Sequence, residues 1–141
     1  MMISTRGRYA LRVMIDLAEH DADGYIPMKD LAERQGISLK YLEKLMPVLS
    51  GGGLVEGVHG KGGGYRLTRP PEEYVVGDLL RLMEGTLAPV ACLEPGTRPC
   101  PRAAECKTLP LWSRLNRVIS ECLDGVTLAD LLSESGYNYV I

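Results

Sequence analysis

Three of the four cysteines in this 141-residue chain, Cys92, Cys100 and Cys106, fall within one stretch of fifteen residues. Thiolates bind metals and take part in redox chemistry, so this stretch is a strong candidate for a chemical function. The N-terminal residues lack the apolar core of a secretory signal, and a disulfide framework is therefore not expected. A structural zinc site would normally contain a close C-x2–4-C pair, which is absent. The cysteine group needs an explanation of its own.

A second candidate is the glycine-rich segment GVHGKGGGYRL at 57–67. A nucleotide-binding P-loop requires G-x-x-x-x-G-K-[ST] between a strand and a helix, but here Lys61 precedes a glycine and the loop leads into a strand. The segment favours a hairpin tip that approaches DNA, where Lys61, Arg66 and Arg69 would neutralise phosphates. The alternative is a flexible hairpin tip that binds nothing. The DNA contacts predicted at this tip are His59, Gly60, Lys61 and Gly62.

The third candidate is a helix predicted over residues 38–46, with Ser38 as its N-cap. Apolar Leu42 and Leu45 would face the core and leave a polar outer face, which a helix in the major groove requires. On that face, Glu43 can accept a hydrogen bond from a cytosine amino group. Alternatively, Glu43 is an exposed residue that pairs with a neighbouring lysine. The DNA contacts predicted for this helix are Ser38, Leu39, Lys40, Tyr41, Glu43 and Lys44.

The elements that would position these residues are three helices followed by a β-hairpin. Helices are predicted over 5–19, capped by Ser4 or Thr5, over 28–36 and over 38–50. Two short helices joined by a tight turn that contains glycine indicate a helix-turn-helix. Strand-like runs at 54–58 and 65–69 complete a winged helix. Pro47 lies inside the third helix and is expected to kink or shorten it.

The second half of the chain is predicted to contain a helix over 75–85, a long loop and a C-terminal helix over 109–125. The loop carries the three cysteines and four prolines, and loops of that length are usually functional or disordered. In the last helix, the apolar stripe Trp112, Leu115, Ile119 and Cys122 has about coiled-coil spacing. The segment VTLADLL adds a final helical turn or two. The predicted fold class is therefore mainly α with a small β-hairpin wing.

Charge and hydropathy narrow the possible environment. The net charge is −2, but residues 1–69 carry ten lysines and arginines against eight acids, whereas residues 70–141 carry six against ten. This asymmetry is compatible with a basic face in the first half. No apolar run reaches membrane-spanning length. We therefore expect a cytoplasmic protein with no membrane partner.

Motifs that define one protein family occur along nearly the whole chain: IST-RGRYAL (3–11), DLAERQGIS-KYLEKL (30–45), GLV (53–55), GGGYRL (62–67), VGDLLRLMEG (76–85), LWSRL and TLADLL. With them the chain resembles the IscR/NsrR/CymR winged-helix regulators of bacteria, the Rrf-two family. The resemblance implies a homodimeric transcriptional regulator that acts as a repressor, with a winged-helix DNA-binding domain (1–84), a cysteine-containing sensor loop (85–108) and a dimerisation helix with a tail (109–141).

The resemblance also implies how the dimer meets DNA. A long C-terminal helix would cross to the other subunit, with the stripe Trp112–Leu115–Ile119 as its seam, and two recognition helices and two wings would address a two-fold-related operator. Arg6, Arg8 and Tyr9 would hold the DNA backbone or brace the recognition helix. His59 stands where relatives often carry arginine at the wing, so a weaker or pH-dependent attraction to the minor groove is expected.

In the iron–sulfur branch of this family, three loop cysteines hold a 2Fe–2S cluster with one non-cysteine ligand, and Cys92, Cys100 and Cys106 occupy that region. Cysteine thiolates are the usual ligands of such clusters. The fourth ligand is unassigned, because Leu109 and Arg8 stand where relatives supply a histidine or a carboxylate. Candidates are Glu94, Glu105 and a backbone or solvent ligand. Cys122 is interpreted as a small core residue.

Other interpretations of the cysteines and of the chain remain open. The cysteines could form a thiol redox switch or be incidental. The ending SGYNYVI resembles the isoleucine-terminated tail of cysteine-metabolism repressors that act with cysteine synthase. From a different class, the chain could be an iron–sulfur redox carrier that borrows the fold. An enzyme is not expected, since no paired base and nucleophile is present and neither histidine lies in a motif.

The cysteine synthase alternative makes a direct prediction about the tail. Deleting Tyr139–Ile141 removes the C-terminal isoleucine that the enzyme's active site would accept, so binding of cysteine synthase is expected to be lost. Titration calorimetry with the intact and the shortened chain measures this. Unchanged binding after the deletion would contradict the partnership.

Overall fold

The computed structural model describes residues 3–133 and confirms the predicted fold class, mainly helical with a two-stranded antiparallel hairpin. The tail SGYNYVI lies outside the described residues. Within residues 3–133, none of the helices has the length and apolar character needed to cross a bilayer. The elements are α1 (Thr5–Glu19), η1 (Asp21–Asp23), α2 (Met28–Gln35), α3 (Leu39–Gly51), β1 (Val55–Val58), β2 (Gly64–Leu67), η2 (Pro71–Glu73), α4 (Val76–Glu84), η3 (Ala91–Leu93), α5 (Leu109–Asp124) and α6 (Leu128–Ser133).

Local capping signals set the helix boundaries close to where the sequence predicts them. The Ser4 hydroxyl accepts a hydrogen bond from the Gly7 amide (3.2 Å) at the start of α1. The Ser38 hydroxyl accepts one from the Tyr41 amide (3.1 Å) at the start of α3. Such caps satisfy amides that have no partner within the helix. Gly36 ends α2 in the left-handed conformation.

Pro47 does not shorten α3, so of the kink or shortening that the sequence predicts, the shortening is wrong. The helix continues through Pro47 to Gly51. Met46 and Leu49 on either side are fully buried, whereas Pro47 itself is exposed. Burial of these neighbours holds the helix against the core, although Pro47 has no amide to donate to the preceding turn.

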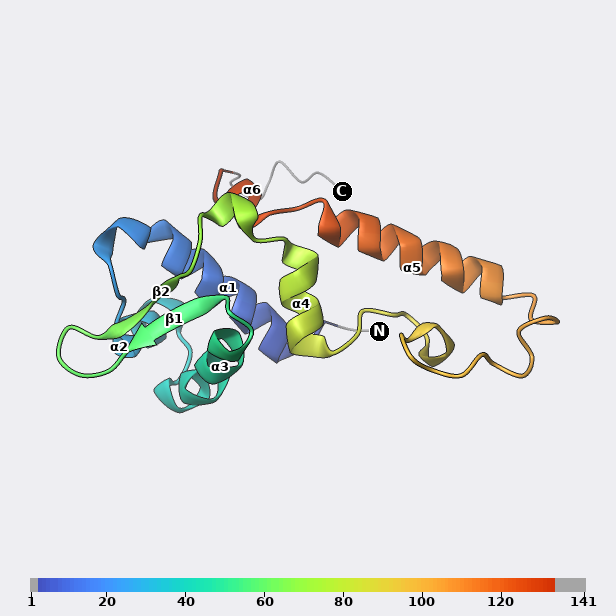
Figure 1. Ribbon diagram of the computed structural model, residues 1–141, viewed down its shortest axis with the longest axis horizontal. Helices are drawn as coiled ribbons and strands as arrows, with labels where there is room; N and C mark the ends of the chain where they lie inside the picture. The colour runs from blue at the N-terminus through green and yellow to red at the C-terminus, as the bar shows by residue number, and fades with distance from the viewer. Residues whose placement is uncertain (1–2, 134–141) are drawn as a thin grey trace.

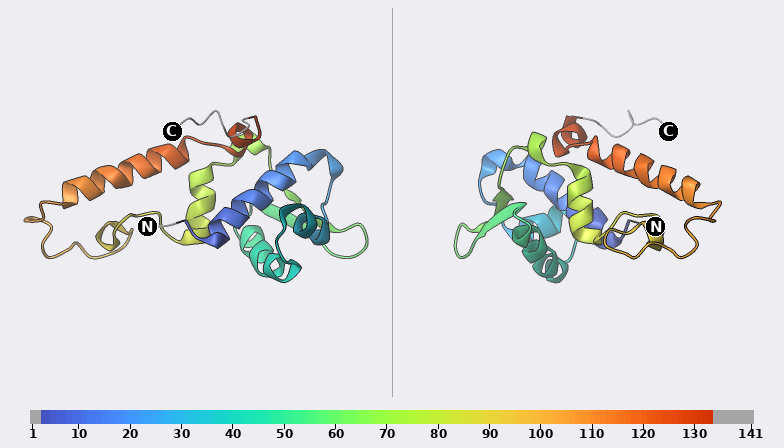
Figure 2. Two further views of the ribbon diagram at one scale, coloured as in Figure 1. Left: turned by 180° about the vertical axis from the view of Figure 1, so that it is seen from behind. Right: turned by 45° about the vertical axis from the view of Figure 1, so that its right-hand side comes forward.

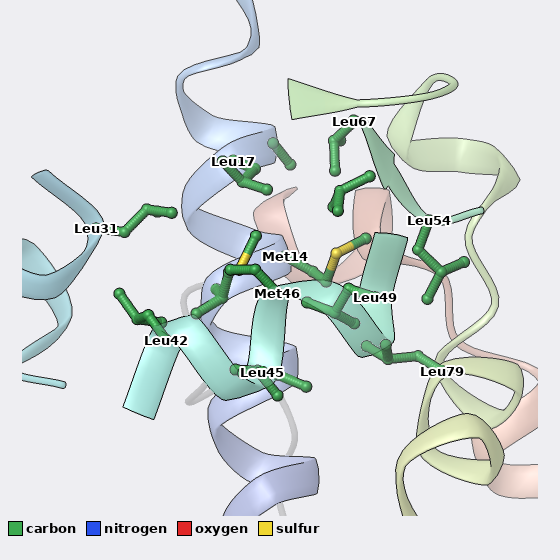
Figure 3. Packing of buried hydrophobic residues seen from close by; sticks show 14 of the residues in the cluster. Met14, Leu17, Leu31, Leu42, Leu45, Met46, Leu49, Leu54, Leu67 and Leu79 are labelled. Atoms are coloured by element: carbon green, nitrogen blue, oxygen red, sulfur yellow. The ribbon is translucent and has the colours of Figure 1, made fainter. Parts of the chain in front are cut away.

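One hydrophobic core joins the three N-terminal helices, the hairpin and α4 (Figure 3). Met14 and Leu17 of α1 pack at its centre, and α3 contributes a full stripe of side chains to it. Burying each such side chain is worth about 1.5–3 kcal/mol. The fully buried members from these elements include Met14, Leu17, Leu31, Leu42, Leu45, Met46, Leu49 and Met83.

The wing is tied to the start of the helix-turn-helix. β1 pairs with β2 in antiparallel register from Val55 opposite Leu67 to Val58 opposite Gly64. Tyr65 also exchanges backbone hydrogen bonds with Ile26 (2.8 and 2.9 Å), which extends the hairpin by one bridge. Gly64 has φ +149°, and a Cβ there would lie 2.2 Å from the Ile26 carbonyl oxygen. Only glycine permits this approach.

Helix α5 and the cysteine loop form an arm that extends from the winged helix, away from the wing (Figures 1 and 2). The C-terminal end of α5 is anchored. Arg81 of α4 donates two hydrogen bonds to Asp124 (2.7 and 2.9 Å), and Val75 and Thr127 form a β-bridge. Ile119 and Leu123 pack against a second, smaller core of Val76, Leu80 and Leu87.

Of the stripe that the sequence predicts on this helix, Leu115 and Cys122 are exposed, Trp112 is half-buried, and Ile119 packs on its own chain. Because Ile119 packs within its own chain, the apolar face that α5 leaves exposed is rotated. We call this face, which comprises Leu111, Leu115, Val118 and Cys122, the α5 stripe. Cys122 is exposed on it and is not a core residue of the single chain.

Candidate DNA-binding surface and cysteine loop

Helix α3 presents its predicted contact residues outward. Ser38, Lys40, Glu43 and Lys44 are exposed, and Leu39 is 43 % exposed although it is large and apolar. Among the salt bridges of residues 3–133, none involves Glu43, so its pairing with Lys40 or Lys44 is not observed. The Glu43 carboxylate is available to accept a hydrogen bond from a ligand.

Tyr41 differs from the other predicted contacts on α3 because it packs against α1. Its ring meets the ring of Tyr9 edge to face, with centroids 5.5 Å apart and an angle of 78° between the planes. The Arg12 guanidinium lies 5.2 Å from the centre of the Tyr9 ring. Aromatic pairs and cation–π contacts of this kind are each worth about 0.5–1.5 kcal/mol. The three side chains therefore hold α3 against α1.

A buried carboxylate holds the end of α2 in place. Asp16 of α1 accepts two hydrogen bonds from Arg34 (2.7 and 3.0 Å) and one from the Gln35 side chain (2.8 Å). Arg12 donates to the Gln35 backbone carbonyl and side chain. Burial alone would raise the pKa of Asp16, but the hydrogen bonds from Arg34 and Gln35 outweigh it and lower this pKa.

The wing tip is exposed next to the start of α2 and the end of α3. His59, Gly60, Lys61 and Gly62 are all exposed, and Lys61 forms no salt bridge with any described residue. A hollow of about 320 Å³ separates the tip from Met28 and Ser50. Thus the structure brings the predicted wing contacts together at one edge of the helix-turn-helix.

The two other cations predicted near the wing already have partners. Arg66 donates a hydrogen bond to Glu56 (2.6 Å) on the opposite strand and lies 4.4 Å from the centre of the Tyr25 ring. Arg69 lies 4.3 Å from the centre of the Tyr74 ring. Of the three cations expected to neutralise phosphates, only Lys61 points from the tip without such a partner within residues 3–133.

The predicted N-terminal contacts are divided between two faces of α1. Tyr9 faces α3, whereas Arg8 lines an apolar hollow of about 400 Å³ on the side of α4, α5 and α6. Arg8 also donates a hydrogen bond to the Thr5 hydroxyl (3.1 Å), and Arg6 is exposed. The other residues that line the hollow are Ile3, Leu11, Val76, Leu80, Leu123, Val126 and Leu131.

The cysteine loop holds its three thiols in two places. Cys92 and Cys100 line one hollow of about 340 Å³ together with Glu94, and Cys106 lines another of about 420 Å³ with Glu105. All of these thiols are free, and no three acidic, histidine or cysteine side chains of residues 3–133 are gathered as a metal site. The structure thus brings together two of the three predicted ligands.

Cys106 lies just before α5, with its sulfur 3.4 Å from the Thr108 hydroxyl. Hydrogen bonds from the Thr108 side chain and from the backbone of Thr108 and Leu109 lower the pKa of Cys106. A lowered pKa increases the thiolate fraction, which is the form that binds metals and reacts with oxidants.

A helix-turn-helix with an exposed polar second helix, flanked by a β-hairpin with an exposed lysine, defines a winged-helix DNA-binding protein. A family model described as "Iron-dependent Transcriptional regulator", Rrf2, matches residues 3–134. The chain belongs to this Rrf2 family of transcriptional regulators, which agrees with the family expected from its motifs. Its relatives are DNA-binding regulators and not enzymes.

Individual relatives agree with this assignment. The chain is 40 % identical over 135 residues to the HTH-type transcriptional regulator IscR of Aliivibrio salmonicida, covering 96 % of this chain and 79 % of the relative. It is also 40 % identical over 135 residues to Protein rrf2 of Nitratidesulfovibrio vulgaris, covering 96 % of this chain and 89 % of that protein.

Solved structures show the same fold. T. potens IscR is 36 % identical, with a TM-score of 0.76, over 100 % of this chain and 93 % of that one. CymR (YrzC), the global cysteine regulator of B. subtilis, is 38 % identical, with a TM-score of 0.77, over 94 % of this chain and 97 % of that one.

Sequence reasoning missed the polar side chains that hold the helix-turn-helix together, namely Arg12, Asp16, Arg34 and Gln35. One signal was present. Asp16 falls beside Val13 and Leu17 on the face of α1 that packs into the core, and a carboxylate on a buried face requires a cation or hydrogen-bond donors. The sequence does not specify which arginine supplies them.

We predict that Asp16→Asn destabilises the fold by about 2 kcal/mol at pH 7. This is less than the loss of a fully buried ion-pair partner, because Arg34 is partly exposed. The pKa of Asp16 is lowered in the folded state. The contribution of its carboxylate to the free energy of unfolding is therefore complete above the unfolded-state pKa near 4, and it disappears as the pH falls through the folded-state pKa. Urea unfolding of parent and variant at pH 7, 5, 4 and 3 measures the difference, which should shrink below pH 4.

Glu19→Gln is the matched control, since Glu19 is an exposed acid on the same helix. It should change stability by less than about 0.5 kcal/mol. An Asp16→Asn variant as stable as the parent at pH 7 would show that the Arg34 contact contributes nothing.

Proposed function

We propose that this chain is a dimeric repressor whose occupancy of its operator is set by the state of the cysteine loop. The observation that carries the proposal is the division of the molecule into two ends (Figure 1). Helix α3 and the hairpin lie on one side of α4, and the cysteine loop lies with α5 on the other side. The predicted contacts of α3 other than Tyr41 are exposed, and the loop's thiols are free. The proposed division is a winged-helix domain (1–84), a sensor loop (85–108) and a dimerisation helix with a tail (109–141).

DNA recognition would use α3 in the major groove and the wing at the adjacent backbone. Glu43 would accept from a cytosine amino group, and the exposed Leu39 suits the methyl group of a thymine. Lys40 and Lys44 would position the helix on phosphates. Lys61 would neutralise a phosphate at the wing, where the glycines allow the backbone to approach the duplex closely.

Two substitutions should separate base reading from phosphate contact. Glu43→Ala is expected to reduce discrimination between operator variants at one base pair by about 1–3 kcal/mol. Lys61→Ala should weaken binding to all duplexes similarly and lower the slope of log affinity against log salt by about one. Fluorescence anisotropy over a salt series with a panel of operator variants measures both. An unchanged ranking of operators with Glu43→Ala would exclude its base-reading role.

Dimerisation would use the α5 stripe. Leu111, Val118 and Leu115 are 56 %, 52 % and 40 % exposed, and residues four or three apart lie on one face of a helix. An apolar stripe of this spacing is typical of a helix that packs on another helix. The apolar hollow beside Arg8 lies near the anchored end of α5 and would extend the covered area.

Introducing a charge on the stripe should therefore separate the subunits. Leu115→Glu is expected to convert the dimer to a monomer and to weaken operator binding, because burying an unpaired carboxylate between helices is costly. Ser113→Glu, an exposed position off the stripe, is the matched control and should remain dimeric. Sedimentation velocity gives the mass of each. A dimeric Leu115→Glu variant would exclude the stripe as the interface.

The donor set of the loop fits an iron–sulfur cluster, which relatives named IscR and the iron-dependent family description also favour. Cys92, Cys100 and Cys106 would hold a 2Fe–2S cluster, with Glu94 or Glu105 as candidates for the fourth ligand. Both carboxylates line the hollows that contain the thiols. The cluster would supply one-electron redox chemistry and sensitivity to oxidants. The chain's own residues would hold the cluster and would pass changes in the order of the loop on to the rest of the chain.

Anaerobic purification with visible absorption and iron and sulfide analysis tests the cluster. We expect a coloured protein with about two irons and two sulfides per chain. Replacing Cys92, Cys100 or Cys106 singly by serine should abolish the colour, whereas Cys122→Ser should keep it. A colourless chain that cannot be reconstituted would exclude the cluster and favour a thiol redox switch.

A second candidate function is repression of cysteine metabolism together with cysteine synthase. The similarity to CymR, described as a global cysteine regulator, favours it. The tail SGYNYVI, which would contact the enzyme, lies outside the described residues. This partnership does not exclude a cluster in the loop.

A further inference from the structure

Glu84 is the last residue of α4 and directly precedes the cysteine loop. Its Oε1 atom accepts two hydrogen bonds from Ser4, one from the backbone amide (2.9 Å) and one from the hydroxyl (2.7 Å). The same hydroxyl accepts the bond from Gly7 that caps α1. The carboxylate that ends one helix therefore holds the cap of another, eighty positions away in the sequence.

The first turn of α1 is built to receive this carboxylate. It contains no acidic residue of its own, although a negative charge near a helix N-terminus stabilises the helix. Gly7 is buried, and a Cβ there would lie 2.3 Å from Glu84 Oε1. The carboxylate thus lies against the backbone of α1 and supplies from α4 the charge that α1 lacks.

The other end of the connection reaches the recognition helix. Tyr9 follows two residues after Gly7, and its ring packs on Tyr41 of α3. Arg12, one turn further along α1, contacts both the Tyr9 ring and the end of α2. A shift in the first turn of α1 would therefore displace the aromatic contact that holds α3.

From these contacts we propose that Glu84 is a positioning residue that couples the cysteine loop to the recognition helix. When the loop is rearranged, the adjoining end of α4 moves, Glu84 releases Ser4, and the uncapped first turn of α1 loosens the Tyr9–Tyr41 contact. In one state Glu84 is hydrogen-bonded to Ser4, and in the other state these hydrogen bonds are broken. This inference rests on the proposed function, since it requires DNA binding that depends on the loop.

The test compares operator affinity in two loop states. The full-length chain purified anaerobically represents one state, and the C92S/C100S/C106S variant represents the other. With Glu84 present, the dissociation constants of the two loop states for an operator duplex should differ by about tenfold. This ratio is within the usual range of coupling between sites. In the Glu84→Ala background, the same ratio should fall to within about twofold of one. Glu84→Gln keeps one acceptor oxygen without the charge and should give an intermediate ratio.

Glu72→Ala is the matched control, because Glu72 is an exposed acid on the turn before α4, and it should keep the parent's ratio. Thermal unfolding followed by circular dichroism reports any loss of fold. A purely structural role would weaken binding by the same factor in both loop states, and a preserved ratio in Glu84→Ala would overturn the inference. A parent ratio of one would overturn it together with regulation by the loop. If no variant binds double-stranded DNA in a salt-sensitive manner, the proposed function itself fails.

Discussion

The arrangement of the helix-turn-helix depends on the compensation of one buried charge. Asp16 is 1 % exposed, and a carboxylate removed from water must be ionised against a cation or else protonated. Arg34 and Gln35 at the end of α2 satisfy it, and their hydrogen bonds hold the end of α2 against α1. Because α3 follows α2 after a turn of three residues, the same contact also restricts where α3 begins.

Helix α1 connects the two ends of the molecule because its opposite faces contact different elements. Tyr9, Arg12 and Asp16 contact the helix-turn-helix, whereas Arg8 and Leu11 line the hollow formed with the last three helices. No direct contact between the cysteine loop and α3 is needed for the ends to influence each other. Interfaces of packed helices change between discrete arrangements, so a small shift of α1 against α4 is sufficient in principle.

Local features of the fold were predictable from the sequence, and long-range features were not. The caps at Ser4 and Ser38, the left-handed Gly36 and the strand–turn–strand pattern of the wing are encoded by neighbouring residues. The partners of Asp16 and Glu84 lie eighteen and eighty positions away, respectively, and spacing does not specify them. Apart from Tyr41, the DNA contacts that the sequence predicts on α3 and at the wing tip lie at exposed positions, but the sequence does not show that Arg66 is paired across the hairpin.

The α5 stripe illustrates why periodicity alone was insufficient. Helix α5 carries apolar residues on two faces, and both have a repeat of three or four residues. Only the packing of Ile119 and Leu123 against the second core decides which face is internal and which is exposed. A two-faced helix of this kind is expected where one side belongs to the chain's own core and the other to an assembly.

The two ends of α5 are attached to the rest of the chain in different ways. The C-terminal end of α5 is fixed by the Arg81–Asp124 pair and by the bridge between Val75 and Thr127. Its N-terminal end is attached to the rest of the chain through the cysteine loop. A helix of sixteen residues is about 24 Å long, so a small rotation about the fixed end becomes a displacement of several ångströms at the tip. The cysteine loop is attached at this tip. If two such arms pack together, a change in the order of the loop would alter the angle between the two winged helices more than a similar change at the fixed end.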